Sequence, residues 1–219
     1  MTDQLVQQRW ESSRRLLVQE MRECLAQGKP RKVNLSVPKH TVIALSLWEL
    51  ATDPTLRGKS LPVVFSDGSS SAPFPVGTLS KAPSEVSCPP LSIRAGLMSF
   101  RHPELDYLVD LYVCRNLEIA KSESMASEEA LAYDRTVDLF GGSDAEAGGL
   151  IEVFHTGLEP LVVGFYRGVV EVLRRRHAKV SPTIVFRGLV FPKKGESEAL
   201  TAQSPGAKRE NYVALPDWR

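Results

Sequence analysis

The chain has 219 residues, of which 42% are hydrophobic and 24% charged, and its formal net charge is +1. This composition is that of a globular protein with a real core. It excludes a wholly disordered chain and a polycation that coats nucleic acid with its entire surface. The three cysteines are too few for a disulfide framework, and the N-terminus lacks the apolar run of a secretory signal. We therefore expect a soluble, cytoplasmic protein, or one of another reducing intracellular compartment, without a membrane span.

The N-terminal part of the chain predicts two helices. Apolar residues recur at helical spacing over 3–27, and Gly28 and Pro30 follow as stop signals. Residues 31–37 form either a short strand or an extended lead-in. Ser36 can cap the second helix at its start. This helix ends at Asp53-Pro54 and is apolar on most sides, so we expect it to be largely buried.

Residues 60–103 differ in character from the helices before them. They hold seven of the fifteen prolines and the turn-forming run SDGSSSAP. Their plausible strands are 61–65 and 91–100. Because several large apolar residues lie among them, we expect an ordered, irregular layer over the helices and not a free linker.

Helices are expected again in the second half of the chain. Residues 104–140 contain no Gly and no Pro, and they show two apolar faces separated by a break at 122–127. Residues 150–155 suggest a short helix. The strongest helical pattern covers 158–176. Here two glycines one turn apart, at 164 and 168, let another backbone approach closely.

The last β-rich segment is 183–191. It forms either one strand with a bulge at Gly188 or a hairpin that turns at Arg187-Gly188. The predicted fold class is α+β: a mainly helical core of four to five helices with a small β-sheet or hairpin from the 60–100 and 183–191 segments. We expect a single domain over 1–192, followed by a mostly flexible basic tail over 193–219 whose end can dock.

Charge is distributed unevenly along the chain. Residues 104–148 hold eleven acids and three bases, a local net charge of −8. Residues 174–219 hold ten bases and four acids, a net charge of +6, and residues 1–60 carry +4. Such faces either neutralise each other within the fold or serve as surfaces for partners.

Few residues suggest catalysis. Glu152 and His155 form an E-x-x-H pair, which on a helix would place both side chains on one face as weak metal-ligand candidates. His102 precedes a proline and an acid that suit a helix start, and an acid–base role for it is the alternative. Cys114 fits a buried thiol better than a nucleophile. No phosphate-binding loop and no dinucleotide motif occur in the sequence, so we expect no cofactor.

A basic cluster closes the strongest helix. Cations at a helix C-terminus are favoured by the helix dipole, so a structural role is sufficient. The alternative is contact with the phosphates of a nucleic acid. The candidate residues are Arg174, Arg175, Arg176, Lys179, Lys193 and Lys194.

The leading functional hypothesis is a non-enzymatic subunit or adaptor of an intracellular multiprotein assembly, acting through apolar helix faces and segregated charged surfaces. Its partners are other proteins or a second copy of the chain. The alternative is a nucleic-acid-associated protein that uses the basic cluster. The third hypothesis is an enzyme with a site near His155 or His102.

Overall fold

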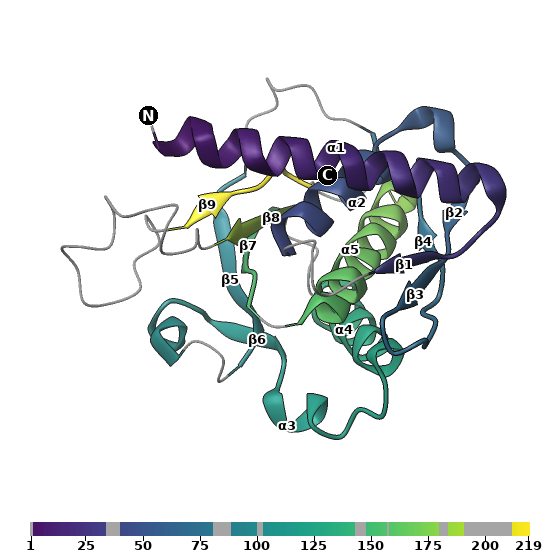
Figure 1. Cartoon of the computed structure of the whole chain (residues 1–219). Coiled ribbons are helices and arrows are strands. Elements are labelled where there is room, and N and C mark those ends of the chain that lie inside the picture. The colour runs from purple at the N-terminus through teal and green to yellow at the C-terminus, as the bar shows by residue number, and fades with distance from the viewer. Residues whose placement is uncertain are drawn as a thin grey trace.

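The computed structural model describes residues 2–33, 40–80, 89–99, 103–142, 148–156, 158–179, 184–190 and 212–219. The N-terminal helix α1 (Thr2–Gln27) lies across α2 (His40–Ala51), as Figure 1 shows. It ends at Gly28, whose φ of 65° is a left-handed conformation that glycine adopts at no steric cost. This confirms the helix predicted over 3–27. α2 is buried around most of its circumference, also as expected.

Two small sheets connect these helices to the rest of the molecule. β1 (Arg31–Val33) pairs in parallel with β3 (Val63–Phe65), and β2 (Ser60–Leu61) pairs antiparallel with β4 (Phe74–Pro75). The 3₁₀ turn η1 (Pro54–Leu56) connects α2 to β2. Asp53 caps it, because its carboxylate accepts the Thr55 N–H at 2.9 Å. The 60–75 stretch is therefore an ordered, largely irregular layer.

The main sheet has five strands in the order β6-β5-β7-β8-β9. The strands are β5 (Leu91–Met98), β6 (Leu111–Cys114), β7 (Gly149–Phe154), β8 (Ile184–Val190) and β9 (Val213–Ala214). β6, β5, β7 and β8 run parallel to one another, and β9 runs antiparallel to β8. β6 and β9 are thus the two edge strands among the residues that the structure describes.

The handedness of the connections decides which element covers which face. The connection from β5 to β6 leads toward the β6 edge of the sheet. The connections from β6 to β7 and from β7 to β8 lead in the opposite direction, toward β9. Because parallel crossovers are right-handed, the 3₁₀ turn η2 (Pro103–Tyr107) lies on one face, and α4 (Met125–Phe140) and α5 (Glu159–Lys179) lie on the opposite face. The short helix α3 (Asn116–Ile119) precedes α4.

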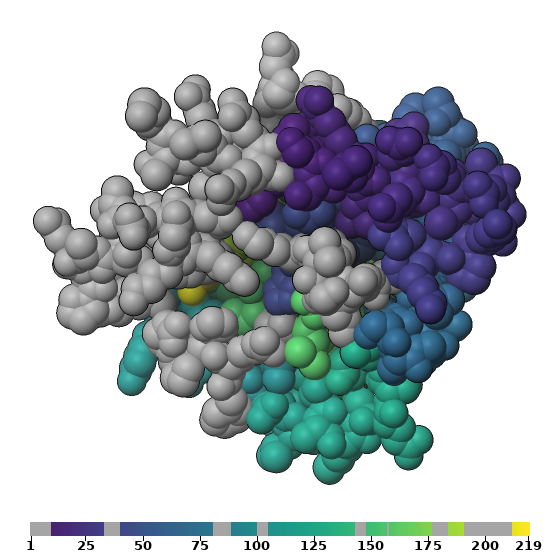
Figure 2. Space-filling view, in the orientation of Figure 1, coloured from purple at the N-terminus to yellow at the C-terminus, as the bar shows by residue number. Residues whose placement is uncertain are grey.

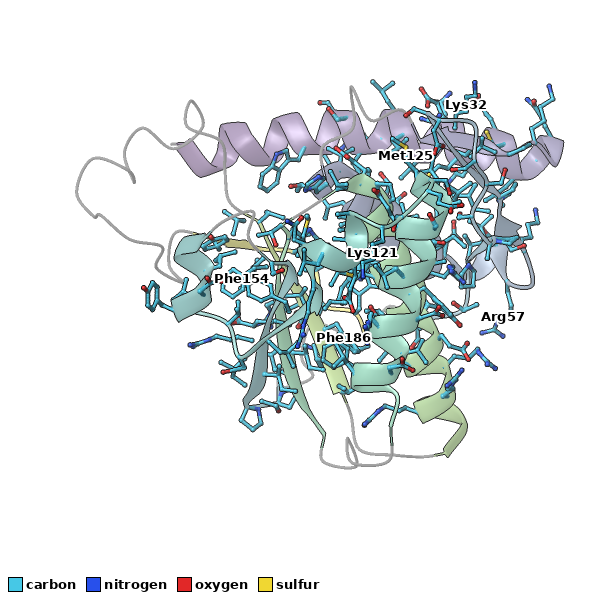
Figure 3. All side chains as sticks on the ribbon, turned by 90° about the horizontal axis from the view of Figure 1, so that it is seen from below. Lys32, Arg57, Lys121, Met125, Phe154 and Phe186 are labelled. Carbon is cyan, nitrogen blue, oxygen red and sulfur yellow. The ribbon has the colours of Figure 1, made fainter. Side chains whose placement is uncertain are left out.

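Two hydrophobic clusters follow from this arrangement. The larger one fills the space between the sheet, the pair α4–α5, and α2 with α1 beyond. The smaller one, on the opposite face, joins Leu105 of η2 to Phe154 and Leu189. Figure 3 shows Phe186 between the sheet and α4, where its ring lies 5.5 Å from that of Phe140, and Phe154 on the side away from that helix.

The two glycines of α5 lie where α4 and α5 come closest. A Cβ added at Gly164 would lie 2.0 Å from the carbonyl oxygen of Glu129, and one at Gly168 would lie 2.7 Å from the Cβ of Thr136. This confirms that both glycines permit a close backbone approach. Within the described ranges, no helix is long and apolar enough to cross a membrane.

The prediction of a mainly helical core with a small sheet or hairpin is wrong. The main sheet is five-stranded and largely parallel, and both of its faces are covered. Two of its strands were assigned to helices from the sequence: β6 within 104–140 and β7 within 150–155. β7 is buried at every residue, so its sequence shows no alternation of apolar and polar positions.

The strand predicted over 183–191 is present without an interruption. β8 pairs residue by residue with β7, so neither the bulge at Gly188 nor the hairpin occurs. Gly188 is required for a different reason, because a Cβ there would lie 2.5 Å from the Tyr166 hydroxyl. The expected cap of the second helix at Ser36 lies outside the described residues.

Candidate functional site

The strongest candidate site is the β6 edge of the main sheet, with which no strand of the described ranges pairs. The Asp110 N–H donates to the Arg94 carbonyl at 2.8 Å, and the Cys114 carbonyl accepts from the Ser99 N–H at 3.2 Å, so both groups face β5. Successive residues of a strand point their backbone groups alternately to the two sides. The N–H and C=O groups of Leu111 and Val113 therefore point outward, where no strand is paired in the described part of the chain. Leu111 is partly exposed, whereas Val113 is only 2% exposed, so the accessible part of this edge is its start at Leu111.

Exposed apolar side chains flank this edge on both sides along the chain. Tyr107, at the end of η2, is 93% exposed, and Leu117, in α3, is 73% exposed. They are the two most exposed large hydrophobic side chains among the described residues. Tyr112 holds η2 against the strand, because its hydroxyl donates to Asp106 at 2.5 Å. An unpaired strand with exposed apolar neighbours is a surface on which another chain can pair.

The surroundings of the β6 edge are acidic. Asp106 and Asp110 are exposed beside the strand. Glu118 accepts the Arg115 N–H and pairs with Arg135, and these two interactions lower its pKa despite partial burial. In Figure 2, the teal surface of α3 and α4, which follow β6 in the chain, forms the lower part of the visible face, well apart from α1 at the top.

The predicted E-x-x-H pair does not form a metal site. β7 is a strand, and residues three apart on a strand point to opposite faces. A Glu152 carboxylate oxygen lies 3.9 Å from the Arg94 Nε, whereas the His155 Nε2 lies 2.6 Å from the Tyr166 hydroxyl oxygen. No group of three or more His, Cys, Asp or Glu side chains suited to a metal occurs in the ranges that the structure describes.

His155 is a core histidine. It is buried, and this burial lowers its pKa to about 3, with the charge of His40 as a smaller contribution in the same direction. The ring is therefore neutral at physiological pH. Among the described residues, its Nδ1 has no hydrogen-bond partner. A group that stays neutral and enclosed is poorly suited to exchange protons with a substrate.

The basic cluster is partly neutralised from within its own helix. The Arg174 guanidinium donates to both carboxylate oxygens of Glu171, at 2.9 and 3.0 Å, and Arg175 donates to the same carboxylate at 2.6 Å. These hydrogen bonds lower the pKa of Glu171, with that of Arg174 contributing most. Arg176 is half-buried. The side chain of Lys179, and Lys193, Lys194 and His102, lie outside the described residues.

A titratable cluster that sequence reasoning missed lies where α2, α4 and α5 begin. The His40 Nε2 is 3.5 Å from a Glu159 carboxylate oxygen, and the Asp67 carboxylate accepts the Met125 N–H at 2.8 Å. Burial raises the pKa of Glu128, and the charges of Asp67 and Glu159 raise it further. Carboxylates at helix N-termini stabilise the helix dipole, so this cluster has a structural explanation. Acids in the first turns of two helices were its signal in the sequence.

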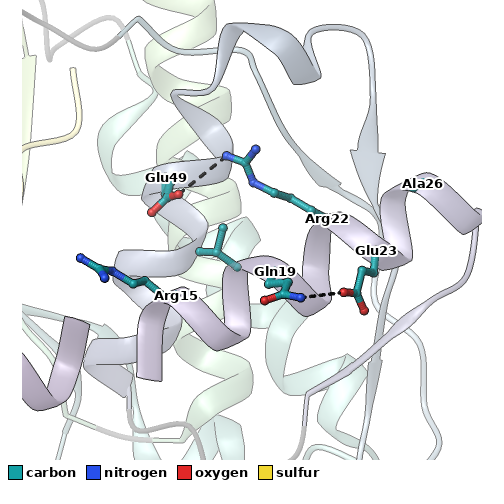
Figure 4. Close-up of a pocket in the computed structure, with 7 residues that line it drawn as sticks. Arg15, Gln19, Arg22, Glu23, Ala26 and Glu49 are labelled. Atoms are coloured by element: carbon teal, nitrogen blue, oxygen red, sulfur yellow. Dashed lines mark hydrogen bonds and ion pairs between the residues drawn. The ribbon is translucent and has the colours of Figure 1, made fainter. Parts of the chain in front are cut away.

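A shallow groove of about 420 Å³ lies along α1 (Figure 4). Arg22 bridges it toward Glu49 of α2 at 3.7 Å, and the Gln19 amide donates to Glu23 at 3.0 Å. Its lining residues are Arg15, Val18, Gln19, Arg22, Glu23, Ala26 and Glu49. Acids and bases are balanced here and largely paired with one another, so the groove presents little unmatched charge to a ligand.

Cys114 is unsuited to nucleophilic catalysis. Burial raises its pKa to about 12, with the charge of Glu118 acting in the same direction, so the thiol stays protonated.

Comparison with known proteins finds no matching family, no matching curated protein and no matching solved structure. The geometry of the β6 edge is thus the observation that bears most directly on function.

Proposed function

We propose that this protein is a non-enzymatic binding subunit of a multiprotein assembly, and that the β6 edge receives an extended segment of its partner. The observation that carries this proposal is the backbone of Leu111, which points away from β5 and pairs with no strand in the described part of the chain. It lies between the exposed side chains of Tyr107 and Leu117. In strand addition, main-chain hydrogen bonds supply affinity and neighbouring side chains supply specificity.

The charge of this surface favours a basic partner. Residues 104–148 carry a net charge of −8, and Asp106 and Asp110 stand beside the edge. A partner strand with Lys or Arg at its ends would gain in association rate and in correct register from these carboxylates. Apolar residues of the same strand would cover Tyr107 and Leu117.

A substitution at the edge tests the proposal. Leu111→Pro removes an N–H that points away from β5, so the strand keeps its pairing inside the sheet while its outer side is blocked. The probe is a library of random peptides displayed on phage. We expect wild type to enrich basic, alternating peptides that Leu111→Pro no longer binds.

The matched control is Leu16→Ser. Leu16 is 65% exposed on α1, far from β6 along the chain, so this variant should bind the enriched peptides as wild type does. Equal binding by wild type and a folded Leu111→Pro chain would contradict the assignment of the edge. Failure to enrich any peptide would contradict the proposed function itself.

The nucleic-acid alternative has less support, because Glu171 already pairs with Arg174 and Arg175. It is tested by the binding of an oligonucleotide at low salt, with wild type compared with a chain in which Arg174, Arg175 and Arg176 are all replaced by Ala. Contacts to phosphates would give an affinity that falls steeply with salt and drops in the variant. Absence of binding at low salt would remove this alternative.

A further inference from the structure

The edge opposite β6 is covered by the chain itself. β9 pairs with Leu189 and Val190, and the Leu215 N–H donates to the Gly188 carbonyl at 2.8 Å. Phe186 and Trp218 then exchange two backbone hydrogen bonds, of 3.0 and 2.9 Å. The segment 212–219 therefore lies antiparallel along most of β8, in the geometry by which an extended peptide adds to a sheet.

Side chains from three elements hold the end of this segment. Trp218 is 1% exposed, and its ring stacks on Tyr166 of α5 with the centroids 4.4 Å apart. The Arg187 guanidinium of β8 donates to both carboxylate oxygens of Asp217, at 2.7 and 3.0 Å. The Trp48 indole N–H of α2 donates to the Asp217 carbonyl at 3.0 Å. We call the residues Trp48, Tyr166, Phe186 and Arg187 the Asp-Trp slot.

The slot selects for charge and for shape. Burial opposes the ionisation of Asp217, but the hydrogen bonds from Arg187 and Arg219 outweigh it and lower the pKa of that carboxyl. The aspartate is therefore held ionised in a bidentate pair, which is the geometry that Arg makes best with a carboxylate. A buried Trp beside a partly buried Arg–Asp ion pair is also a composition typical of an interface hot spot.

None of these contacts requires the segment to be local in sequence. Asp217 is 30 residues from Arg187 and 169 from Trp48. The same backbone and side-chain contacts can form with an equivalent segment of another molecule. We propose that the Asp-Trp slot is a peptide-recognition site, filled here by the chain's own residues, and that a partner protein with an extended segment containing an Asp-Trp dipeptide displaces them. This site is separate from the β6 edge and does not depend on the function proposed for that edge.

Competition with the chain's own segment determines how much more weakly a free peptide binds the filled slot than the vacant one. A tethered segment acts at an effective concentration on the order of 1 mM. If a free peptide binds the vacant slot with a Kd of about 10 µM, the filled slot of wild type should bind it about 100-fold more weakly. Occupancy would then be regulated by the local concentration of the partner.

The test uses the full chain and a fluorescent peptide with the sequence of residues 212–219. Trp218→Ala removes the indole from the chain's own segment and leaves the slot residues intact. We expect fluorescence anisotropy to show binding to Trp218→Ala that is about 100-fold tighter than to wild type. A peptide carrying Ala in place of its Trp should not bind.

A second variant tests the carboxylate contact. Arg187→Ala, added to Trp218→Ala, should weaken binding of the native-sequence peptide by about 10- to 100-fold, as expected for a hydrogen bond to a charged group. A cooperative thermal melt shows that each variant is folded. Asp217→Ala retains the buried indole, so it serves if Trp218→Ala does not fold.

Three results would overturn the proposal. The first is a folded Trp218→Ala chain that does not bind the peptide. The second is equal binding of the peptides with and without Trp. The third is loss of folding in both Trp218→Ala and Asp217→Ala, which would show that the segment is a permanent part of the core.

Discussion

Glu129 and Arg167 form the most deeply enclosed ion pair among the described residues. The Glu129 side chain is 1% exposed and that of Arg167 is 12% exposed, and two hydrogen bonds of 2.7 and 3.1 Å join them. Arg167 also lies over the Tyr133 ring, 3.7 Å from its centroid. Burial raises the pKa of Glu129, opposed by the hydrogen bonds from Arg167. The pair therefore depends on both partners being present.

Removing one partner should be costly. Glu129→Ala leaves the Arg167 guanidinium enclosed without its carboxylate, and we expect a loss of about 3–5 kcal/mol in the free energy of unfolding. The double variant Glu129→Leu, Arg167→Leu should lose less than Glu129→Ala, since no unpaired charge remains. Urea denaturation of the three chains measures this. A double variant less stable than the single one would show that the pair contributes more than packing can replace.

His155 should make the stability of the protein depend on pH. Its pKa is about 3 in the folded chain and about 6.5 when unfolded, so the unfolded state binds the proton first as pH falls. The stabilisation is complete above pH 6.5 and is lost as pH falls toward 3. Between these pH values, the free energy of unfolding of His155→Gln should fall less steeply with falling pH than that of wild type, by up to about 1.4 kcal/mol per pH unit. Urea denaturation midpoints at several pH values measure this. The same pH dependence in wild type and His155→Gln would contradict the lowered pKa of His155.

The contact between α4 and α5 is the element-scale feature that the sequence indicated best. Glycines 164 and 168 bring the helix backbones together, and Phe165 and Phe140 both contact Phe186 of the sheet below. The separation of the two helices is therefore set by the absence of two side chains. Any added atom must move a helix or deform a neighbour.

Alanine at these glycines should destabilise in a defined order. Gly164→Ala places a Cβ against a backbone carbonyl, and Gly168→Ala places one against the less rigid Thr136 side chain. We expect both to lose about 1–3 kcal/mol, with Gly164→Ala losing more. Gly142→Ala is the control, because no described residue lies within 4 Å of a Cβ at that position. Thermal melts compare the three, and equal melting temperatures would mean that the helices are not in close contact.

At the scale of the whole molecule, the two edges of the main sheet differ. The β8 side is covered by residues 212–219, and in the described part of the chain no strand covers β6. Natural sheets protect their edges by covering them, keeping them short or flanking them with charge. β6 has four residues, with Asp110 before it and Arg115 after it. These features limit unspecific pairing while leaving room for one matched partner.

Amide hydrogen exchange should reveal the free edge directly. The N–H groups of Leu111 and Val113 point away from β5, whereas that of Tyr112 points toward it. Of the two outward amides, that of Leu111 belongs to a partly exposed residue and that of Val113 to a buried one. We expect exchange at Leu111 to be at least about 10-fold faster than at Tyr112 when followed residue by residue by NMR. Equal protection of these two amides would mean that another part of the chain covers the edge.

The sequence by itself determined the helices with clear periodicity and clear stops. α1 and α5 were predicted nearly to their ends, and the strand over 184–190 was visible from its β-branched and aromatic residues. The close approach at Gly164 and Gly168 was also readable, because glycine inside a helix requires a compensating contact. These are local signals, and each depends only on residues within a few turns.

Only the tertiary structure decided the sheet and the candidate site. β7 is buried on both faces, so its residues carry no period that separates a strand from a helix. β6 is a short apolar run within a stretch of helical pattern, and it became a strand because β5 offered it a partner. The β6 edge and the Asp-Trp slot exist because strands distant in sequence lie side by side. Local sequence cannot encode them, since each is formed by groups whose proximity the folded chain alone provides.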